Sequence, residues 1–154
     1  MPVLVVLLLV PLGCMQNGIE RGNPLEGRWV LDLSRSHYGG GAEPRSRETL
    51  TCVARGDGVS CTIESVRPDG RELTGRFDVS YDGTPGAVTG IPDVDQVSLR
   101  RVNEHIADAT FSLRGRPVFG YRAVQSADGQ ELTITSVDPT TRAVLESVIV
   151  YDRQ

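Results

Sequence analysis

LTCVARGDGVSCTI, at residues 50–63, carries the clearest strand-turn-strand pattern of the chain. Apolar and polar residues alternate on both sides of the Gly-Asp-Gly segment at 56–58, which is the pattern of two antiparallel strands joined by a tight turn. A two-residue loop at the first two of these residues, or a four-residue loop around them, places Cys52 opposite Cys61 on an apolar face. Cβ atoms at opposite positions come within reach of a disulfide, so the hairpin predicts a cross-strand bridge. Two buried thiols acting as small hydrophobes are the alternative.

The rest of the chain repeats this alternating pattern. Helical periodicity is absent after residue 14, and short alternating runs separated by Asp-Gly and similar turns recur about every 12 residues. The predicted strands are 27–34, 48–54, 59–67, 71–81, 86–90, 94–102, 106–113, 118–125, 131–137 and 144–152. Sequential hairpins without long crossovers predict an all-β fold, a single antiparallel up-and-down barrel of about 8–10 strands.

Turn lengths indicate which residues face each other across the other hairpins. The expected pairs are Leu50–Ile63, Ala54–Val59, Cys61–Phe77, Ile63–Gly75, Val97–Phe111, Leu99–Ala109, Leu113–Phe119, Phe111–Tyr121, Ala123–Ile134 and Tyr121–Ser136. This register gathers one apolar face, which comprises Trp29, Leu31, Leu33, Leu50, Phe77, Tyr81, Val97, Phe111, Phe119, Tyr121, Ile134, Ile149 and Tyr151. A one-sided apolar sheet cannot bury such a face alone, so the sheet is expected to close on itself.

The N-terminal segment, residues 1–14, resembles a bacterial lipoprotein signal peptide. Its apolar run is shorter than the roughly 20 residues that span a bilayer, and it ends in Gly13-Cys14, which is similar to a lipobox. The resemblance implies export and a lipid on Cys14, with ordinary secretory cleavage as the alternative. Residues 15–24 are polar and are expected to form a flexible tether, which leaves 25–154 as one barrel domain. The expected location is the periplasm or the outer membrane, through the lipid anchor, or else the secreted fraction.

The two ends of the predicted barrel resemble those of lipocalins. Gly27-Arg28-Trp29 opens the first strand, and a glycine followed two residues later by tryptophan is similar to the lipocalin signature. In that family the tryptophan packs at the closed end of the barrel beneath a basic residue of the last strand. The resemblance therefore implies that Arg153 covers Trp29. The opening strand is also similar to that of small uncharacterised bacterial exported lipoproteins.

The segment after the first strand departs from the related fatty-acid-binding proteins. Residues 34–47 contain three consecutive glycines and a proline without an apolar period, so they cannot form the two lid helices of that family. A mobile flap at the barrel mouth and a plain surface loop are the alternatives.

The inward face offers a candidate ligand site. Small residues leave room beside the aromatic side chains, namely Ala54, Gly75, Ala107, Ala109, Ala123 and Ser147. Arg101 lies beside the turn at 103–105, near a rim, where it could pair with a carboxylate or phosphate, or extend to solvent. The candidate ligand-binding residues are Phe77, Tyr81, Arg101, Phe111 and Tyr121.

Two functions fit these features. The first is binding of a small apolar or amphipathic ligand in the barrel. The second is a cell-envelope interaction module or enzyme inhibitor with a filled core, whose contact surface would be 34–47 or 84–92. A cavity of about 300 Å³ or more would favour the first function.

Composition and histidine placement disfavour other classes. The net charge is −4 with both signs scattered, which indicates no nucleic-acid partner and no membrane contact beyond the lipid anchor. His37 and His105 both fall in predicted loops, so the sequence offers few residues for a metal centre or a Ser-His pair. We therefore expect no enzyme, no metal and no cofactor. A small hydrophobic ligand and an envelope protein are the expected partners.

Overall fold

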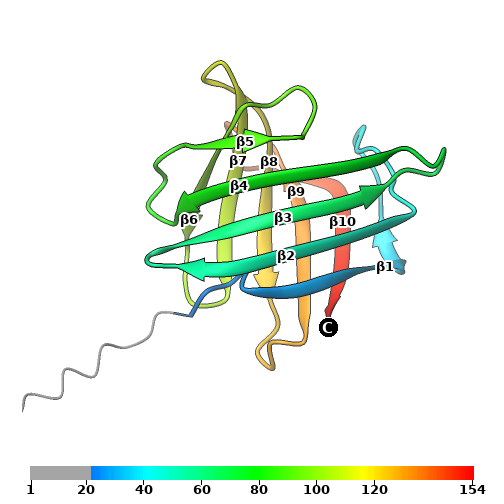
Figure 1. The fold of residues 1–154 in the computed structure, drawn as a ribbon, viewed down its shortest axis with the longest axis horizontal. Coiled ribbons are helices and arrows are strands. Elements are labelled where there is room, and N and C mark those ends of the chain that lie inside the picture. Colours follow the sequence, from blue (N-terminus) through cyan, green and yellow to red (C-terminus); the bar gives the residue numbers. More distant parts are fainter. Residues whose placement is uncertain (1–21) are drawn as a thin grey trace, which may run out of the picture.

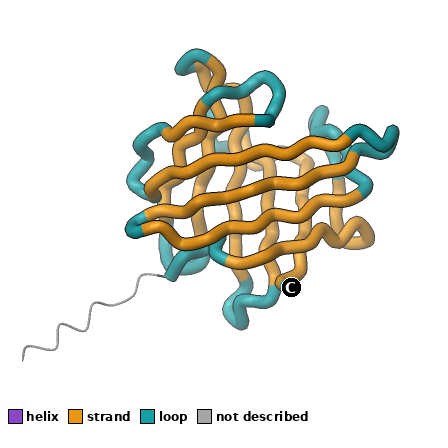
Figure 2. The backbone as a smooth tube through the Cα atoms, viewed as in Figure 1, coloured by secondary structure: helices purple, strands orange, loops and turns teal. Residues whose placement is uncertain are grey.

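The computed structural model describes residues 22–154, and these form one closed barrel of ten antiparallel strands (Figures 1 and 2). The strands are β1 (Gly27–His37), β2 (Arg47–Arg55), β3 (Gly58–Val66), β4 (Glu72–Ser80), β5 (Gly86–Thr89), β6 (Gln96–Arg101), β7 (Ile106–Leu113), β8 (Arg116–Gln125), β9 (Glu131–Val137) and β10 (Val144–Arg153). Each strand pairs with its neighbours in sequence, and β1 pairs with β10 to close the sheet. The predicted up-and-down barrel is therefore confirmed. Within the described residues no helix is long and apolar enough to cross a membrane.

The predicted signal peptide with Cys14, and residues 15–21 of the predicted tether, lie outside the described residues. Asn23 and Pro24, at the end of the expected tether, pack against the barrel: Pro24 is fully buried, and the Asn23 side-chain amide donates to the Gly58 carbonyl over 3.2 Å. Residues 23 and 24 thus already belong to the packed barrel.

The hairpin of residues 50–63 has the predicted register. Cys52 lies opposite Cys61, their Cα atoms are 4.2 Å apart, and a disulfide joins them. This spacing is typical of a non-hydrogen-bonded antiparallel pair, which brings side chains closest. Arg55 pairs with Gly58, so the loop between β2 and β3 has two residues. The predicted disulfide is confirmed.

Most of the other expected pairs are confirmed as well. They are Leu50–Ile63, Ala54–Val59, Cys61–Phe77, Ile63–Gly75, Val97–Phe111, Leu99–Ala109, Ala123–Ile134 and Tyr121–Ser136. Each follows from a short turn whose length sets the register.

The predicted register between β7 and β8 was wrong by two residues. Phe111 faces Phe119, and Leu113 pairs with Arg116. Arg114 and Gly115 form a tight turn with positive φ angles of 50° and 76°, and a bulge follows between Phe111 and Ser112. Positive φ is uncommon at a non-glycine residue, so a two-residue turn that includes Arg114 could not be predicted from the residue type.

The second half of β1 also differs from the prediction. Leu33, expected in the core, is 48% exposed, and His37, expected in a loop, belongs to the strand. The Asp32 carboxylate accepts a hydrogen bond from the Ser34 backbone nitrogen at 2.9 Å, and the pairing with β10 is irregular between Asp32 and His37. This local hydrogen bond breaks the two-residue alternation, which turns Leu33 outward.

The barrel has a closed end and an open end. The chain enters β1 and leaves β10 at the closed end (Figure 1), where Trp29 is completely buried and donates from Nε1 to the Leu25 carbonyl over 2.8 Å. The Arg153 guanidinium lies 4.5 Å above the Trp29 ring, and its Nε donates to the Gly129 carbonyl over 2.6 Å. This is the arrangement that the lipocalin resemblance implies. The loop 38–46 and the connections 67–71, 90–95, 114–115 and 138–143 lie at the open end.

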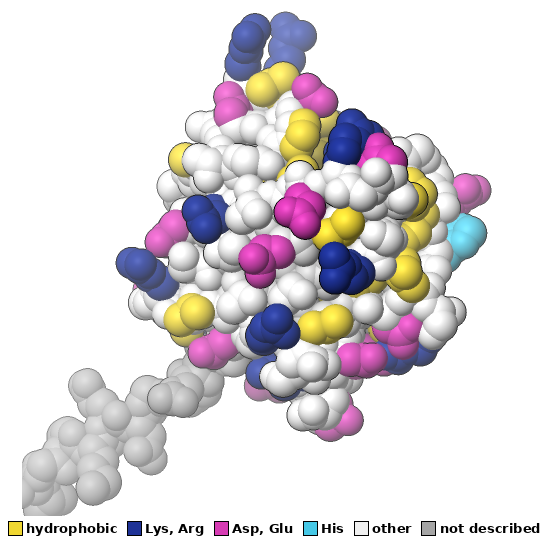
Figure 3. Space-filling view, turned by 45° about the vertical axis from the view of Figure 1, so that its right-hand side comes forward, with side chains coloured by type: hydrophobic (Ala, Val, Ile, Leu, Met, Phe, Trp, Pro, Cys, Tyr) yellow, Lys and Arg dark blue, Asp and Glu magenta, His cyan; other side chains and the backbone are white. Residues whose placement is uncertain are grey.

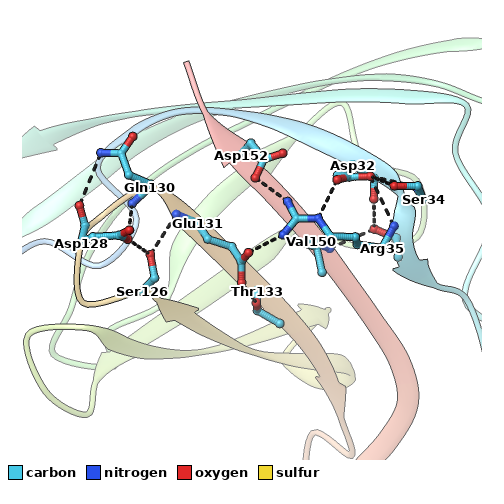
Figure 4. Close-up of polar contacts among 11 residues, drawn as sticks. Asp32, Ser34, Arg35, Ser126, Asp128, Gln130, Glu131, Thr133, Val150 and Asp152 are labelled. Carbon is cyan, nitrogen blue, oxygen red and sulfur yellow. Dashed lines mark hydrogen bonds and ion pairs between the residues drawn. The ribbon is translucent and has the colours of Figure 1, made fainter.

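A single arginine reaches across the strands where the barrel closes (Figure 4). Arg35 of β1 contacts Asp32 on the same strand at 2.6 Å, Asp152 of β10 at 2.5 Å and Glu131 of β9 at 2.5 Å. All four side chains are at least partly exposed, so these contacts add little to the free energy of unfolding. Their main effects are to orient the side chains and to lower the pKa of the Asp32 carboxyl. Elsewhere on the face that Figure 3 shows, acidic and basic side chains are interspersed.

The Asp32 carboxyl is expected to titrate at unusually low pH. Hydrogen bonds from the Ser34 hydroxyl and from Arg35 lower its pKa from 3.8 to about 2. Because the folded pKa lies below the unfolded one, the contribution of Asp32 to stability is present above pH 3.8 and is lost as the pH falls towards 2. Carbon-13 NMR of the side-chain carboxyl should show this midpoint, and Arg35→Gln should move it towards 3.8.

The matched control for this titration is Arg71→Gln, which removes a similar exposed ion pair with Asp69. It should leave the Asp32 midpoint unchanged. An Asp32 midpoint near 3.8 in the unmodified protein would contradict the hydrogen-bond arrangement of Figure 4.

Candidate ligand-binding cavity

The barrel encloses a cavity of about 530 Å³ that opens between the connections of the open end. Its wall is mostly apolar and comes from inward-facing positions of the strands, among them Leu50, Ile63, Leu73, Leu99, Ile134 and Ile149. Cavities of about 300–1,000 Å³ with apolar walls and a few polar groups are typical of sites for small molecules.

Three of the candidate residues, Phe77, Phe111 and Tyr121, line this cavity. The Phe111 ring stacks on Phe119 with centroids 4.7 Å apart and meets Phe77 and Tyr121 edge-on, each at 6.1 Å. The aromatic side chains thus form one continuous part of the wall, which fixes their orientation around the cavity.

The other two candidates, Tyr81 and Arg101, lie at the closed end, away from the cavity lining. The Arg101 guanidinium stacks 4.6 Å from the Tyr81 ring centroid, and the Tyr81 hydroxyl donates to Asn23 Oδ1 over 2.5 Å. Burial raises the pKa of Tyr81, which keeps this hydroxyl protonated. Arg101 does lie near a rim, as expected, but the sequence does not show which rim is open.

Only some of the small residues that were predicted on the inward face line the cavity. Ala107, Ala109 and Ala123 line the cavity. At Gly75 the Ile91 side chain fills the space, because a Cβ there would lie 2.5 Å from Ile91 Cγ1. Of the remaining two, Ser147 is buried outside the lining, and Ala54 is exposed near the end of β2.

The loop 38–46 forms part of the cavity wall. Gly39 to Arg45 all contact the cavity, so the loop is more than a plain surface connection. It is not helical, as predicted. Consecutive glycines at 40 and 41 adopt positive φ angles of 59° and 83°, a backbone conformation that lets the loop fold back over the barrel mouth.

A buried polar cluster that was not predicted from the sequence lies on the wall of the cavity. Glu48 is only 5% exposed, and its Oε2 lies 2.6 Å from Arg45 Nε. The Ser65 hydroxyl donates to Oε2 and the Tyr151 hydroxyl donates to Oε1. Both oxygens of the carboxylate are therefore satisfied inside the barrel, as a buried charge requires.

The electrostatics of this cluster keep the arginine charged and the tyrosines neutral. Burial is the largest single influence on the pKa of Arg45 and lowers it, but Glu48 and the surrounding tyrosines together outweigh burial and raise that pKa. Burial raises the pKa of Tyr151 well above its usual range, and the Glu48 charge adds to this. Burial also raises the pKa of Tyr38 and Tyr121, which the nearby Arg45 charge partly offsets. The tyrosines are hydrogen-bond donors at neutral pH.

One signal for this cluster was present in the sequence. Glu48 shares the alternation of Leu50 and Cys52, which places a carboxylate on the core face of the strand. A charge at a core position requires a partner, so the pattern predicts a buried ion pair. Arg45, in an irregular loop, carries no comparable signal.

Within residues 22–154, no group of three or more His, Cys, Asp or Glu side chains is arranged so that it could hold a metal ion. Comparison of the chain with protein-family models, with curated proteins and with solved structures gave no significant match.

Proposed function

We propose that this protein is an exported, lipocalin-like barrel that binds a small apolar or amphipathic ligand in its interior. The observation that carries the proposal is the 530 Å³ cavity, which exceeds the size expected for a filled core. The part of the cavity towards the closed end is apolar, and the part towards the open end carries the buried Glu48–Arg45 cluster. This combination suits a ligand with an apolar body and a polar head.

The alternative, an interaction module with a filled barrel, receives less support. Such a module would need large side chains where Ala107, Ala109 and Ala123 leave space. The lipocalin resemblance rests on Gly27-Arg28-Trp29 and on the stacking of Arg153 over Trp29.

We further propose that the protein is anchored through a lipid on Cys14. The Cys52–Cys61 disulfide supports an oxidising location, because such bridges persist outside the cytosol. The apolar run before Gly13-Cys14 supports export. Mass spectrometry of protein isolated from its own host, under native and denaturing conditions, reports both a co-purifying ligand and a lipid on the peptide that begins at Cys14.

The ligand proposal is tested most directly with a neutral fluorescent probe, N-phenyl-1-naphthylamine, whose emission rises in apolar surroundings. We expect saturable binding of one probe per barrel. Ala109→Phe places a ring in the cavity and should weaken binding by about tenfold or more. Thr89→Phe adds the same ring on the exposed side of β5 and serves as the matched control.

Saturable binding that Ala109→Phe reduces and Thr89→Phe leaves unchanged would support an interior site. Probe binding that is equal in all three proteins would place the probe on the surface. Absence of saturable binding in the unmodified protein would overturn the proposed function.

A further inference from the structure

The charged groups that line the cavity do not form a binding site for an anion. Arg45 and Arg67 contribute two positive charges, whereas Glu43, Glu48 and Asp93 contribute three negative ones. Both arginines are already paired with carboxylates: Arg45 Nε lies 2.6 Å from Glu48 and Arg67 lies 2.5 Å from Glu43. A ligand carboxylate would therefore meet no uncompensated cation in this wall.

The Glu48 carboxylate takes the position that a ligand carboxylate would otherwise occupy. It receives donors from Arg45, Ser65 and Tyr151, and it is almost completely buried. A second carboxylate beside Arg45 would be repelled by Glu48 at short range and would also lose its hydration. The attraction to one guanidinium cannot offset both costs.

Hydrogen-bond donors nevertheless remain in this part of the wall, because Arg45 and Tyr121 both line the cavity. Burial raises the pKa of Tyr121, so its hydroxyl stays protonated and can donate at neutral pH. The Arg45 guanidinium lies beside this hydroxyl, with its Nε 2.6 Å from Glu48. A ligand oxygen that accepts the Tyr121 proton would keep that hydroxyl hydrogen-bonded when water leaves the cavity.

We propose that the cavity selects ligands with a neutral, hydrogen-bond-accepting oxygen, such as an alcohol, ester or ketone, on an apolar body, and that Glu48 determines this selectivity by excluding carboxylates. The inference rests on the proposed function, since it concerns the same cavity. The apolar body would contact Leu99, Phe111 and Ile149, and the oxygen would lie near Tyr121 and Arg45.

Competition against N-phenyl-1-naphthylamine at pH 7.5 with three ligands of equal chain length tests the selectivity. Decan-1-ol and methyl decanoate are neutral, and decanoate carries a charge at that pH. In the unmodified protein both neutral ligands should compete at least about tenfold more strongly than decanoate. Their relative strength shows whether a hydroxyl or an ester oxygen is preferred.

Glu48→Gln tests the role assigned to this residue, because it keeps the size of the side chain and removes the charge that balances Arg45. Decanoate should then bind about tenfold more tightly, while the two neutral ligands change little. Glu43→Gln is the matched control: it removes a lining carboxylate that is 66% exposed at the mouth, and it should leave the order of the ligands unchanged.

The outcomes separate the two proposals. Failure of the probe to bind the unmodified protein would overturn the proposed function. Probe binding with decanoate equal to or stronger than decan-1-ol would overturn the selectivity alone. If the unmodified protein shows the expected order of affinities but decanoate binds folded Glu48→Gln no more tightly, the role of Glu48 is overturned. If that variant fails to fold, the ranking in the unmodified protein still tests the selectivity, and Arg45→Met, which leaves Glu48 without its counter-charge, should weaken decanoate further.

Discussion

Replacing Trp29 with alanine is expected to lower the free energy of unfolding by about 3–5 kcal/mol, as truncation of a buried aromatic side chain does. Trp29 has no solvent exposure, and its removal leaves a cavity at the closed end. The variant also loses the hydrogen bond to the Leu25 carbonyl and the stacking surface of Arg153. Few other single side chains combine these three contributions.

Urea denaturation followed by far-ultraviolet circular dichroism measures this loss, since the variant lacks the chain's one tryptophan. Leu33→Ala is the matched control on the same strand: the side chain is 48% exposed, so its truncation should change stability by less than about 0.5 kcal/mol. A loss below about 1 kcal/mol for Trp29→Ala would contradict the packing described at the closed end.

The parts of the fold that could be predicted from the sequence are those that short turns control. A loop of known length sets the register of the whole hairpin, and every second residue then shares a face. The turn at Gly56-Asp57 placed Cys52 opposite Cys61, and the turn at 103–105 placed Val97 opposite Phe111. These registers bring the apolar residues onto one face of the sheet, and closure of the sheet was predicted because that face must be buried.

The errors arose where a local interaction overrides the alternation. Hydrogen bonds to Asp32 turn Leu33 outward, and the positive φ of Arg114 tightens the turn between β7 and β8. Both depend on side-chain or backbone geometry that hydrophobic periodicity does not report.

The site was predicted only in part because strand patterns do not distinguish the two ends of a barrel. Phe111 and Tyr121 were placed on the inward face and line the cavity, whereas Arg101 lies at the closed end. The arginine of the buried cluster in the cavity wall is Arg45, which belongs to an irregular loop, and its position depends on tertiary contacts with Glu48. The signal available from sequence was Glu48 itself, a charge at a core position.

Loss of the Cys52–Cys61 bridge is expected to lower the free energy of unfolding by about 2–3 kcal/mol on the chain-entropy model. The two residues are nine apart in sequence, so the bridge closes a short loop in the unfolded chain. Each sulfur is also buried at 2% exposure, and a serine in its place brings a hydroxyl into the core. Cys52→Ser, Cys61→Ser and the double variant should therefore all be less stable than the oxidised protein in urea denaturation.

A shared bridge predicts a particular pattern among these variants. Either single replacement removes the whole cross-link, so the double variant should lose no more than either single one. Dithiothreitol should destabilise the unmodified protein by a similar amount and leave the double variant unchanged. Additive losses, or a double variant that still responds to the reductant, would mean that the two sulfurs act as separate core side chains. Because β2 and β3 are held in register by their two-residue turn, the barrel should still fold without the bridge, which keeps the comparison between these proteins interpretable.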